Sequence, residues 1–269
     1  MKKTILLTGA TDGIGLQTAK KLLALGHNVL LHGRNGQKLA DVAQSLALIP
    51  ERGVIDSYVA DLSILADVEA LASAVSAKYQ KIDVLINNAG VFKMSDAINA
   101  QGVDARFIVN TIAPFLLTKR LLPLLDKDAR VINLSSAAQS PVDLTALAAK
   151  HHLSDSMAYA QSKLALTMWT FELAEQLANT GPAIIALNPK SLLATNMVKE
   201  AYGIAGSDLS VGADILVKSA LSAEFSGATG TYFDNDIAQF SDPHPDALNP
   251  QKRRAVLQTI EQFLKDADA

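Results

Sequence analysis

Short apolar runs alternate with longer segments of helical period along almost the whole chain, and this alternation constrains the fold more than any other feature. Most of the runs are continuously apolar and have strand length, which is typical of strands covered on both faces. They lie at 4–8, 28–32, 56–60, 84–87, 130–134, 183–187 and 230–233. The pattern predicts an α/β fold: a Rossmann-type doubly wound parallel sheet of about seven strands, with helices on both faces.

No linker, repeat or low-complexity tract interrupts the alternation, so we expect a single domain over 1–269. The long irregular stretch at about 188–209 follows a predicted strand and is expected to form a lid over the substrate. A C-terminal tail, 241–269, carries a last predicted helix at 250–265.

Composition excludes several classes of function. The chain has 269 residues, a net charge of −3 and no cysteine. This balance predicts no basic face for nucleic acid, and the lack of cysteine excludes disulfides and thiolate metal sites. The apolar run in "MKKTILLTGA" is too short for a signal peptide, and no stretch approaches the roughly 18 apolar residues of a membrane span. We expect a cytoplasmic protein.

The stretch "TGATDGIG" (8–15) follows the first predicted strand and opens the first predicted helix. Glycines at such a junction let the backbone turn tightly and approach a pyrophosphate, whose charge rests on the helix N-terminus. The sequence therefore predicts a dinucleotide site here. Its predicted cofactor-binding residues are Gly9, Thr11, Asp12, Gly13, Ile14 and Gly15.

The end of the second strand favours NADP(H) over NAD(H). An acidic residue at this place would bind a ribose 2′-hydroxyl, whereas an arginine would meet a 2′-phosphate. The sequence has Gly33 where an acid is expected, and Arg34 follows. A guanidinium matches a phosphate well, although Asp12 in the glycine loop opposes the added negative charge.

Further cofactor contacts are expected after the third and fourth strands. Asp61, in "VADLS", is placed to reach the adenine edge or to cap a helix, with Ser63 the better cap candidate. In "NNAG", Asn87 is expected to be structural, and Gly90 allows close approach of backbone. The predicted cofactor-binding residues of these two segments are Asp61, Leu62, Asn88, Ala89 and Gly90.

In "AYAQSK", Tyr159 and Lys163 are four residues apart, so they lie on one face of a helix. An ammonium near a phenol favours the phenolate and lowers the phenol pKa from about 10 toward neutrality. A tyrosine tuned in this way is suited to general acid/base catalysis.

Five motifs occur together and in order over the chain from Lys3 to about Phe233, and they resemble the short-chain dehydrogenase/reductase family. The similarity is greatest to its retinol-dehydrogenase-like and protochlorophyllide-reductase-like branch. It implies an NADP(H)-dependent oxidoreductase that transfers hydride between the nicotinamide and a carbonyl or alcohol, as a homodimer or homotetramer. Tyr159 is then the acid/base, and Lys163 also holds the nicotinamide ribose. The motifs are "TGATDGIG", "NNAG", "VNTIAPF", "NLSS" and "YAQSK".

Two further catalytic residues follow from the resemblance. It places the hydroxyl that polarises the substrate on Ser136, with Ser135 as the rival one residue earlier. It also assigns Asn110 to a water that links the lysine to solvent. Pro114 lacks an N–H, so the Asn110 carbonyl is expected to lose its helical partner at a kink, or the helix simply breaks there.

The chain departs from the family pattern after the sixth strand. Pro189 is followed by Lys190 where the family has glycine, and Ala194 stands at the expected threonine, one residue before Thr195. If φ at Lys190 is positive, lysine costs about 1 kcal/mol or more there, and if φ is negative it costs little. Lysine can also be tolerated at this position without any function. We include Pro189 and Lys190 among the predicted cofactor contacts, because the lysine could reach the diphosphate or an acidic substrate.

The lid carries apolar residues that would line a substrate site. Met197 and Tyr202 are the predicted substrate contacts, beside Val198 and Ile204. No metal site is expected, because adjacent His151 and His152 diverge on any regular element.

Alternatives remain at this stage. A dehydratase or epimerase would share the Tyr–Lys pair. A cofactor-sensing regulator without turnover is a second alternative, although such proteins commonly lose the tyrosine that this chain keeps. The helix after Tyr159 is apolar on several faces, which fits either a subunit interface or a helix buried in a monomer.

Overall fold

The computed structural model describes residues 1–94, 97–99, 102–178 and 180–267; the side chain of Tyr202, a predicted substrate contact, lies outside what it describes. Within this part of the chain, eight strands form one sheet in the order β3-β2-β1-β4-β5-β6-β7-β8. The strands are β1 Thr4–Leu7, β2 Asn28–Gly33, β3 Ile55–Val59, β4 Val84–Asn87, β5 Arg130–Leu134, β6 Ala183–Asn188, β7 Thr231–Asp234 and β8 Gln239–Ser241.

The predicted fold class is confirmed, with one addition. The seven predicted strands pair in parallel, and β8 adds an antiparallel edge beside β7. The strand β8 was not predicted, because "QFS" (239–241) is too short and too polar to show a strand pattern.

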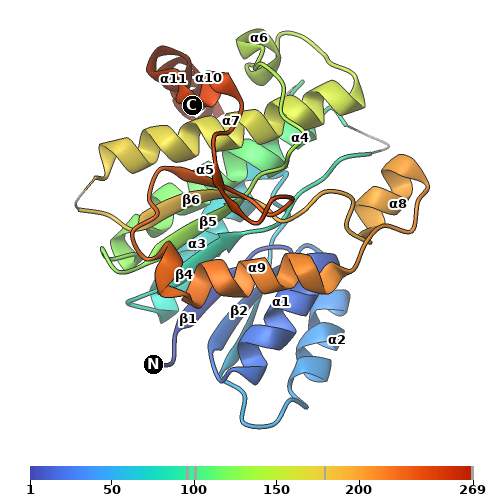
Figure 1. Ribbon diagram of the computed structural model, residues 1–269, viewed down its shortest axis with the longest axis vertical. Coiled ribbons are helices and arrows are strands. Elements are labelled where there is room, and N and C mark those ends of the chain that lie inside the picture. Colours follow the sequence, from blue (N-terminus) through green and yellow to red (C-terminus); the bar gives the residue numbers. More distant parts are fainter. Residues whose placement is uncertain (95–96, 100–101, 179, 268–269) are drawn as a thin grey trace.

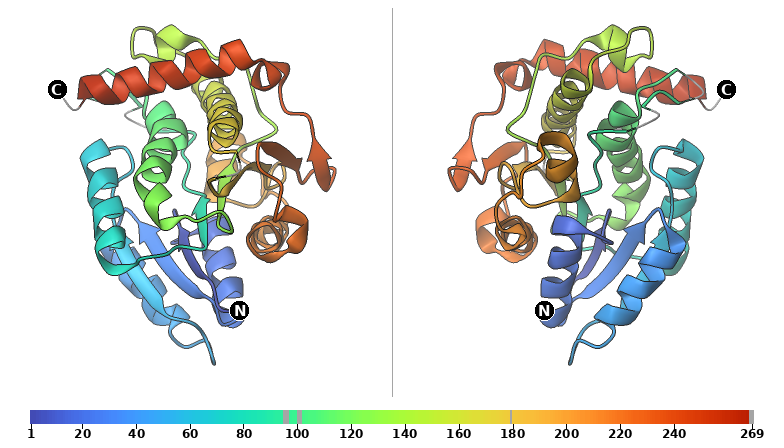
Figure 2. Two further views of the ribbon diagram at one scale, coloured as in Figure 1. Left: turned by 90° about the vertical axis from the view of Figure 1, so that its left-hand side faces the viewer. Right: turned by 90° about the vertical axis from the view of Figure 1, so that its right-hand side faces the viewer.

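Helices cover both faces of the sheet (Figures 1 and 2). Helices α1, α2 and α9 pack on one face, and α3, α5 and α7 pack on the other, where α11 crosses α7. The helices are α1 Gly13–Ala24, α2 Gly36–Leu46, α3 Leu65–Lys78, α4 Ala105–Phe107, α5 Ala113–Leu121, α6 Leu144–Leu147, α7 Asp155–Gln176, α8 Asn196–Tyr202, α9 Leu209–Leu221, α10 Pro245–Leu248 and α11 Pro250–Ala267.

The two cores explain why the strands are continuously apolar. Adjacent residues of a strand point to opposite faces. In β1, Leu6 packs in the core under α3, α5 and α7, whereas Ile5 and Leu7 pack in the core under α1, α2 and α9. The three apolar residues of the strand are therefore all buried.

Strand β1 lies between β2 and β4, so the chain crosses to opposite sides of β1 as it builds the sheet. Ligands of such sheets bind in the crevice at this switch point, beyond the carboxyl ends of the strands. The glycine loop, "NNAG" and "NLSS" all leave strands at that edge.

The apolar helix α7 is covered within the protomer. Leu164, Leu166, Met168 and Trp169 are all buried, and α11 packs along α7. The apolar faces of α7 fitted either a subunit interface or a helix buried in a monomer. Burial within one chain is enough to explain these residues. The helical run Ala105–Leu124 is long and apolar enough to span a membrane, but 72% of its apolar 18-residue window is buried inside the protein.

His32 in β2 joins three strand ends beneath the glycine loop. Its Nδ1 accepts the Gly9 N–H at 3.2 Å, and its Nε2 lies 3.0 Å from the Ala60 carbonyl oxygen. This pair of bonds requires a neutral ring with the proton on Nε2. Burial lowers the pKa of His32, because a charged imidazolium would lose its hydration.

Stability should therefore decrease as the pH falls. The unfolded chain takes up a proton on this histidine near pH 6.5, whereas the folded protein does so only at lower pH. Below pH 6.5 the unfolding free energy of the wild type should fall more steeply than that of His32→Gln, by up to about 1.4 kcal/mol per pH unit. Urea denaturation at pH 7.5, 6.0 and 5.0 measures both slopes; equal slopes would contradict the assignment.

Candidate active site

The glycine loop has the geometry that the sequence predicts. Gly9 and Gly13 have φ of +65° and +51°, which favours glycine at both positions. A Cβ on Gly15 would stand 2.1 Å from the Gly9 carbonyl oxygen, and one on Gly9 would stand 2.9 Å from the Ala89 Cα. The loop thus packs tightly against "NNAG" and turns directly into α1.

Asp12 forms the N-cap of α1, with its Oδ1 accepting the Gly13 N–H at 2.7 Å. Its Oδ2 accepts bonds from Lys38 Nζ and from Asn196 Nδ2, both at 2.8 Å. The bond from Lys38 is the largest influence that lowers the Asp12 pKa. The negative charge that opposed an NADP(H) site in the sequence is therefore balanced by a lysine on α2.

The end of β2 leaves little room for the acidic side chain that binds the ribose in NAD-binding sites. A Cβ on Gly33 would stand 2.6 Å from Thr11 Cγ2, so the side chain of Thr11 occupies that space. Arg34 follows and is exposed. Together with Lys38, Arg34 places two cationic side chains beyond β2.

The "NNAG" residues tie strand ends together. Asn88 Nδ2 donates to the carbonyls of Thr8 and Gly9 at 2.8 and 3.1 Å, and the Ala89 N–H donates to Thr8 Oγ1. Asn87 Nδ2 donates to Asn133 Oδ1 at 2.8 Å, in the structural role expected for it. The side chain of Asn88 therefore supports the loop, and the backbone around it is what faces the crevice.

Asp61 caps no helix. Its Oδ1 accepts the Ser63 N–H and hydroxyl, and α3 begins at Leu65 with Ile64 as an N-cap that forms no side-chain bond. The expectation that Ser63 caps α3 is wrong, because the hydroxyl of Ser63 is turned back to Asp61. Leu62 is 6% exposed and packs in the core, so only its backbone is available to a ligand.

Tyr159 and Lys163 lie on one face of α7, as predicted. The Lys163 ammonium is buried, donates to the Leu134 carbonyl at 2.7 Å and lies 5.8 Å from the centre of the Tyr159 ring. Burial lowers the pKa of Lys163 to about 8. The edge of the Phe92 ring packs on Tyr159, with ring centres 4.8 Å apart.

Gly90 is the point at which two predicted catalytic residues meet. A Cβ on Gly90 would stand 3.3 Å from Asn110 Oδ1 and 3.5 Å from Lys163 Nζ. Asn110 also holds the backbone of Val91, accepting its N–H at 2.8 Å and donating to its carbonyl at 2.9 Å. A third bond, to Ser162 Oγ at 3.0 Å, ties Asn110 to α7.

The irregularity predicted near Asn110 is a π-helical turn, Ile108–Ile112, between α4 and α5. The Ala113 N–H donates to the Ile108 carbonyl, five residues earlier, and Pro114 stands in the first turn of α5. The wider turn accommodates the missing N–H of proline. A water on the Asn110 carbonyl stays a prediction.

The two serines of "NLSS" have different surroundings. Ser135 is buried, with its Oγ 2.7 Å from Thr167 Oγ1 and 3.4 Å from the Lys163 carbonyl. Ser136 is partly exposed, and its Oγ accepts the Ala138 N–H at 3.1 Å. A hydroxyl that accepts in this way keeps its proton for another acceptor, which favours Ser136 as the one that meets a substrate.

Two side chains that were not predicted hold the backbone of Ser136. Tyr232 OH and Gln139 Nε2 donate to its carbonyl at 3.2 and 2.9 Å, and Gln139 Oε1 accepts the His244 N–H. Tyr232 comes from β7 and Gln139 from the loop after β5. No local pattern marks either one, because the sheet brings them together.

Of the two backbone conformations left open for Lys190, the structure has the strained one. Lys190 has φ of +121°, and Leu192 has φ of +53°. Farther along, Thr195 caps α8, with its Cγ2 3.6 Å from where a Gly13 Cβ would be. The predicted lid thus crosses the glycine loop.

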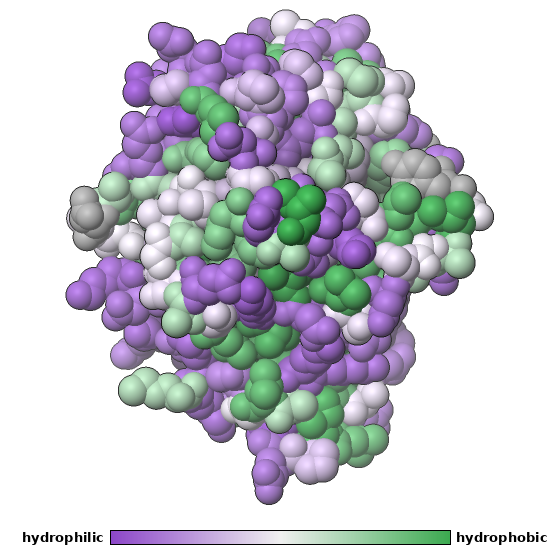
Figure 3. Space-filling model, viewed as in Figure 1, coloured by the Kyte–Doolittle hydropathy of each residue, from purple (hydrophilic) through white to green (hydrophobic). Residues whose placement is uncertain are grey.

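The apolar side of the lid is partly open to solvent. Met197 Cε would be 3.9 Å from a Cβ on Gly90, and Val198 is half-buried. Leu192 and Ile204 are 48% and 41% exposed. Hydrophobic residues gather in this region of the surface, at the α8 end of the molecule (Figure 3).

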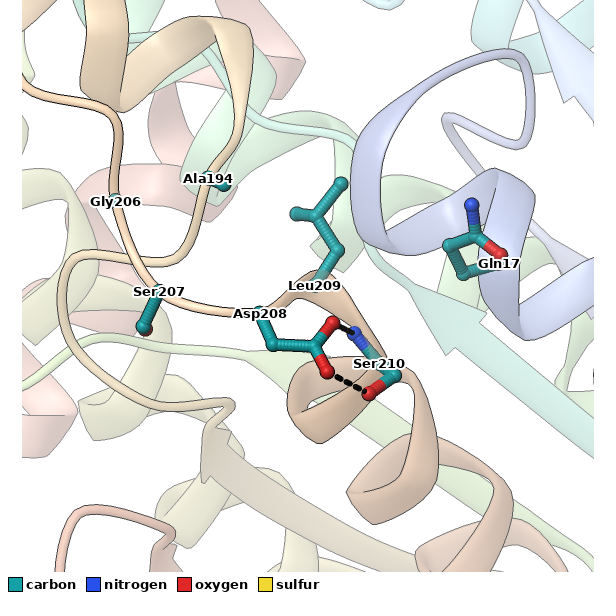
Figure 4. Close-up of a pocket in the computed structure, with 7 residues that line it drawn as sticks. All are labelled: Gln17, Ala194, Gly206, Ser207, Asp208, Leu209 and Ser210. Atoms are coloured by element: carbon teal, nitrogen blue, oxygen red, sulfur yellow. Dashed lines mark hydrogen bonds between the residues drawn. The ribbon is translucent and has the colours of Figure 1, made fainter.

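An open pocket of about 430 Å³ lies between α1 and the end of the predicted lid, where the chain enters α9 (Figure 4). It contains none of the predicted catalytic, cofactor or substrate residues. Its lining is Gln17, Ala194, Gly206, Ser207, Asp208, Leu209 and Ser210.

Comparison with protein families matches residues 3–203 to the short chain dehydrogenases. The chain belongs to the short chain dehydrogenase family. It is 32% identical to human retinol dehydrogenase 13 over 94% of this chain and 82% of that protein. This chain covers 58% of the length of mouse retinol dehydrogenase 13 and 77% of the length of human retinol dehydrogenase 14. The predicted family is confirmed, and relatives of this name agree with the retinol-dehydrogenase-like branch.

Solved short chain dehydrogenases have the same fold. A metagenomic short-chain oxidoreductase in complex with NADP is 28% identical, with a TM-score of 0.63 over 82% of this chain and 92% of that one. The NADPH-bound carbonyl reductase from chicken fatty liver is 25% identical, with a TM-score of 0.70 over 89% of this chain and 98% of that one.

Among the described residues, no group of three or more histidine and acidic side chains could hold a metal ion. His151 and His152 are both exposed and lie in the loop before α7.

Replacing Lys190 with glycine should stabilise this short chain dehydrogenase. Glycine adopts a φ of +121° without the steric cost that a side chain brings, so Lys190→Gly should raise the unfolding free energy by about 1 kcal/mol. Lys190→Ala is the matched control, because it removes the charge and keeps the Cβ. Urea denaturation of the three proteins measures the effect; equal gains for glycine and alanine would contradict strain as its cause.

Proposed function

We propose that this chain is an NADP(H)-dependent oxidoreductase that interconverts a carbonyl compound and its alcohol, with Tyr159 as general acid/base. The observation that carries the proposal is the buried ammonium of Lys163, 5.8 Å from the Tyr159 ring and beside Gly90. This arrangement stands at the sheet edge where the glycine loop turns into α1. Structural roles alone do not account for a cation buried at that edge.

The residues present fit a dinucleotide phosphorylated on its adenosine ribose. The positive φ angles of Gly9 and Gly13 open the loop before the N-terminus of α1, where backbone N–H groups favour a pyrophosphate. Arg34 lies beyond β2, where a 2′-phosphate would need a cation, and Lys38 balances the negative charge of Asp12. NADPH, when bound, supplies the hydride. The NADP and NADPH bound by the two solved relatives support this preference.

Tyr159 is the residue we propose to give a proton to the carbonyl oxygen, or to take one from the alcohol. A pKa of about 8 keeps Lys163 mostly protonated at neutral pH. The positive charge stabilises the phenolate left after proton donation, and burial of the ammonium limits the screening of that charge by water. The Leu134 carbonyl fixes the ammonium in place.

Ser136 is proposed to orient the reacting oxygen. Its hydroxyl would donate a hydrogen bond that strengthens as negative charge develops on that oxygen. Tyr232 and Gln139 hold its backbone, which fixes the direction of the side chain.

The substrate we propose is an apolar alcohol or aldehyde. Phe92 packs on Tyr159, and Met197 approaches Gly90, so apolar side chains border the proposed reacting centre. The name of the human relative, retinol dehydrogenase 13, supports this class.

Tyr159→Phe should abolish turnover and leave cofactor binding intact. Loss of a general acid/base lowers kcat by about 10²- to 10⁴-fold, whereas the phenol is not needed to hold NADPH. Stopped-flow reduction of an aldehyde panel and NADPH fluorescence titration measure the two properties. The control is Tyr58→Phe, which removes a buried hydroxyl on β3 with no hydrogen-bond partner among the described residues.

Two results would contradict the assignment of Tyr159. One is unchanged turnover by the Tyr159→Phe protein. The other is a wild type that binds NADPH and reduces no carbonyl, which would favour the cofactor-sensing alternative.

Arg34→Ala should weaken NADPH binding selectively. A charge-assisted bond between a guanidinium and a phosphate is lost, so the Kd for NADPH should rise about tenfold and the Kd for NADH should not change. Isothermal titration of both cofactors measures the ratio, with Arg254→Ala on α11 as the control. An equal loss for NADH and NADPH would overturn the role of Arg34 in cofactor choice.

A further inference from the structure

The segment that leaves β6 holds an unfavourable backbone at Lys190. A non-glycine residue with positive φ costs about 1–3 kcal/mol and persists only where surrounding groups hold it. At Lys190 φ is +121°, so neighbouring groups must hold this conformation.

The end of β7 and the turn that follows it hold this segment through three consecutive residues, Asp234, Asn235 and Asp236, which we call the DND turn. Asp236 makes more of the contacts than either of the other two residues. Its Oδ1 accepts the Ser191 N–H at 3.0 Å, and its Oδ2 accepts the Ser191 hydroxyl at 2.5 Å and Asn188 Nδ2 at 2.9 Å. The bonds from Asp236 therefore fall on both sides of Lys190.

The other two residues of the DND turn complete the attachment. Asn235 donates from Nδ2 to the Pro189 carbonyl at 2.9 Å and from its backbone N–H to the Asn188 carbonyl at 3.1 Å. Asp234 Oδ1 accepts Asn188 Nδ2 at 2.8 Å. Residues 188, 189 and 191 are thus all bound to one turn, which leaves the backbone at Lys190 little freedom.

Charge contributes to the same contact. Partial burial raises the pKa of Asp236, but bonds from Ser191 and Asn188 and the nearby charge of Lys190 together keep it below its ordinary value. The carboxylate is therefore ionised at neutral pH and accepts all three bonds.

The attached segment lies beside the proposed reacting centre. The Ser135 N–H donates to the Leu187 carbonyl, so β6 leaves the sheet next to "NLSS". Beyond Lys190, the chain reaches Thr195 at the glycine loop and Met197 near Gly90. The direction taken at Lys190 thus decides where the lid crosses the crevice.

We propose that Asp236 is a positioning residue that holds the strained β6–α8 connection against the nicotinamide half of the cofactor. This inference rests on the proposed function. It also lies outside the part of the chain that the family comparison matches, residues 3–203.

The direct test compares two ligands. Asp236→Ala should raise the Kd for NADPH about tenfold and leave the Kd for 2′,5′-ADP, which lacks the nicotinamide half, within about twofold of wild type. A merely structural role would weaken both ligands or neither. Asp242→Ala, an exposed carboxylate in the same C-terminal segment, is the control. Ser191→Ala removes one exposed partner of Asp236 and should give the same selectivity at smaller size.

A second test asks whether strain at Lys190 is the reason that Asp236 is needed. In a Lys190→Gly background the loss of NADPH affinity caused by Asp236→Ala should shrink to less than about threefold, because glycine adopts positive φ unaided. In a Lys190→Ala background the loss should remain about tenfold, because the Cβ remains. An equal loss in the glycine and alanine backgrounds would overturn the inference.

Unfolding of the ligand-free proteins separates this inference from the proposed function. Urea denaturation of wild type, Lys190→Gly, Asp236→Ala and the double variant should show that the effects of the two substitutions on the urea midpoint are not additive. Additive effects would overturn the link between Asp236 and Lys190, whatever the cofactor. A wild type that binds 2′,5′-ADP but not NADPH, or neither ligand, would refute the proposed function.

Discussion

The buried ammonium of Lys163 is the constraint on which the rest of the site depends. A lysine taken out of water must be held by oxygen atoms, and here the carbonyl at the end of β5 holds it. That contact fixes the rotation of α7 against the sheet, which in turn fixes Tyr159 one helical turn earlier. Ser162, the residue before the lysine, holds Asn110 from the same helix. One helix thus organises groups from β4, β5 and the π-helical turn.

Much of this arrangement could be predicted from the sequence, because local patterns carry it. The seven parallel strands follow from their apolar runs, and the glycine loop from a junction where positive φ is required. Lys163 and Tyr159 are related by helical spacing alone. From the sequence, an energetic cost was expected at Lys190 only if φ there is positive, and in the structure φ is positive.

The remainder could not be predicted, because it depends on side chains that only the folded sheet brings together. Nothing near Asp12 in the sequence indicates that Lys38 and Asn196 share its carboxylate. The cap expected from Ser63 failed for a similar reason: Asp61 competes for its hydroxyl. Strand β8 was missed since pairing with β7, rather than its own composition, makes it a strand.

The DND turn has a consequence for how this protein can change over generations. Lysine at position 190 keeps its unfavourable positive φ only while a carboxylate from a distant part of the chain holds the neighbouring residues. A chain with glycine at this position would be freer to vary the DND turn. With lysine there, each of the two segments narrows the substitutions open to the other.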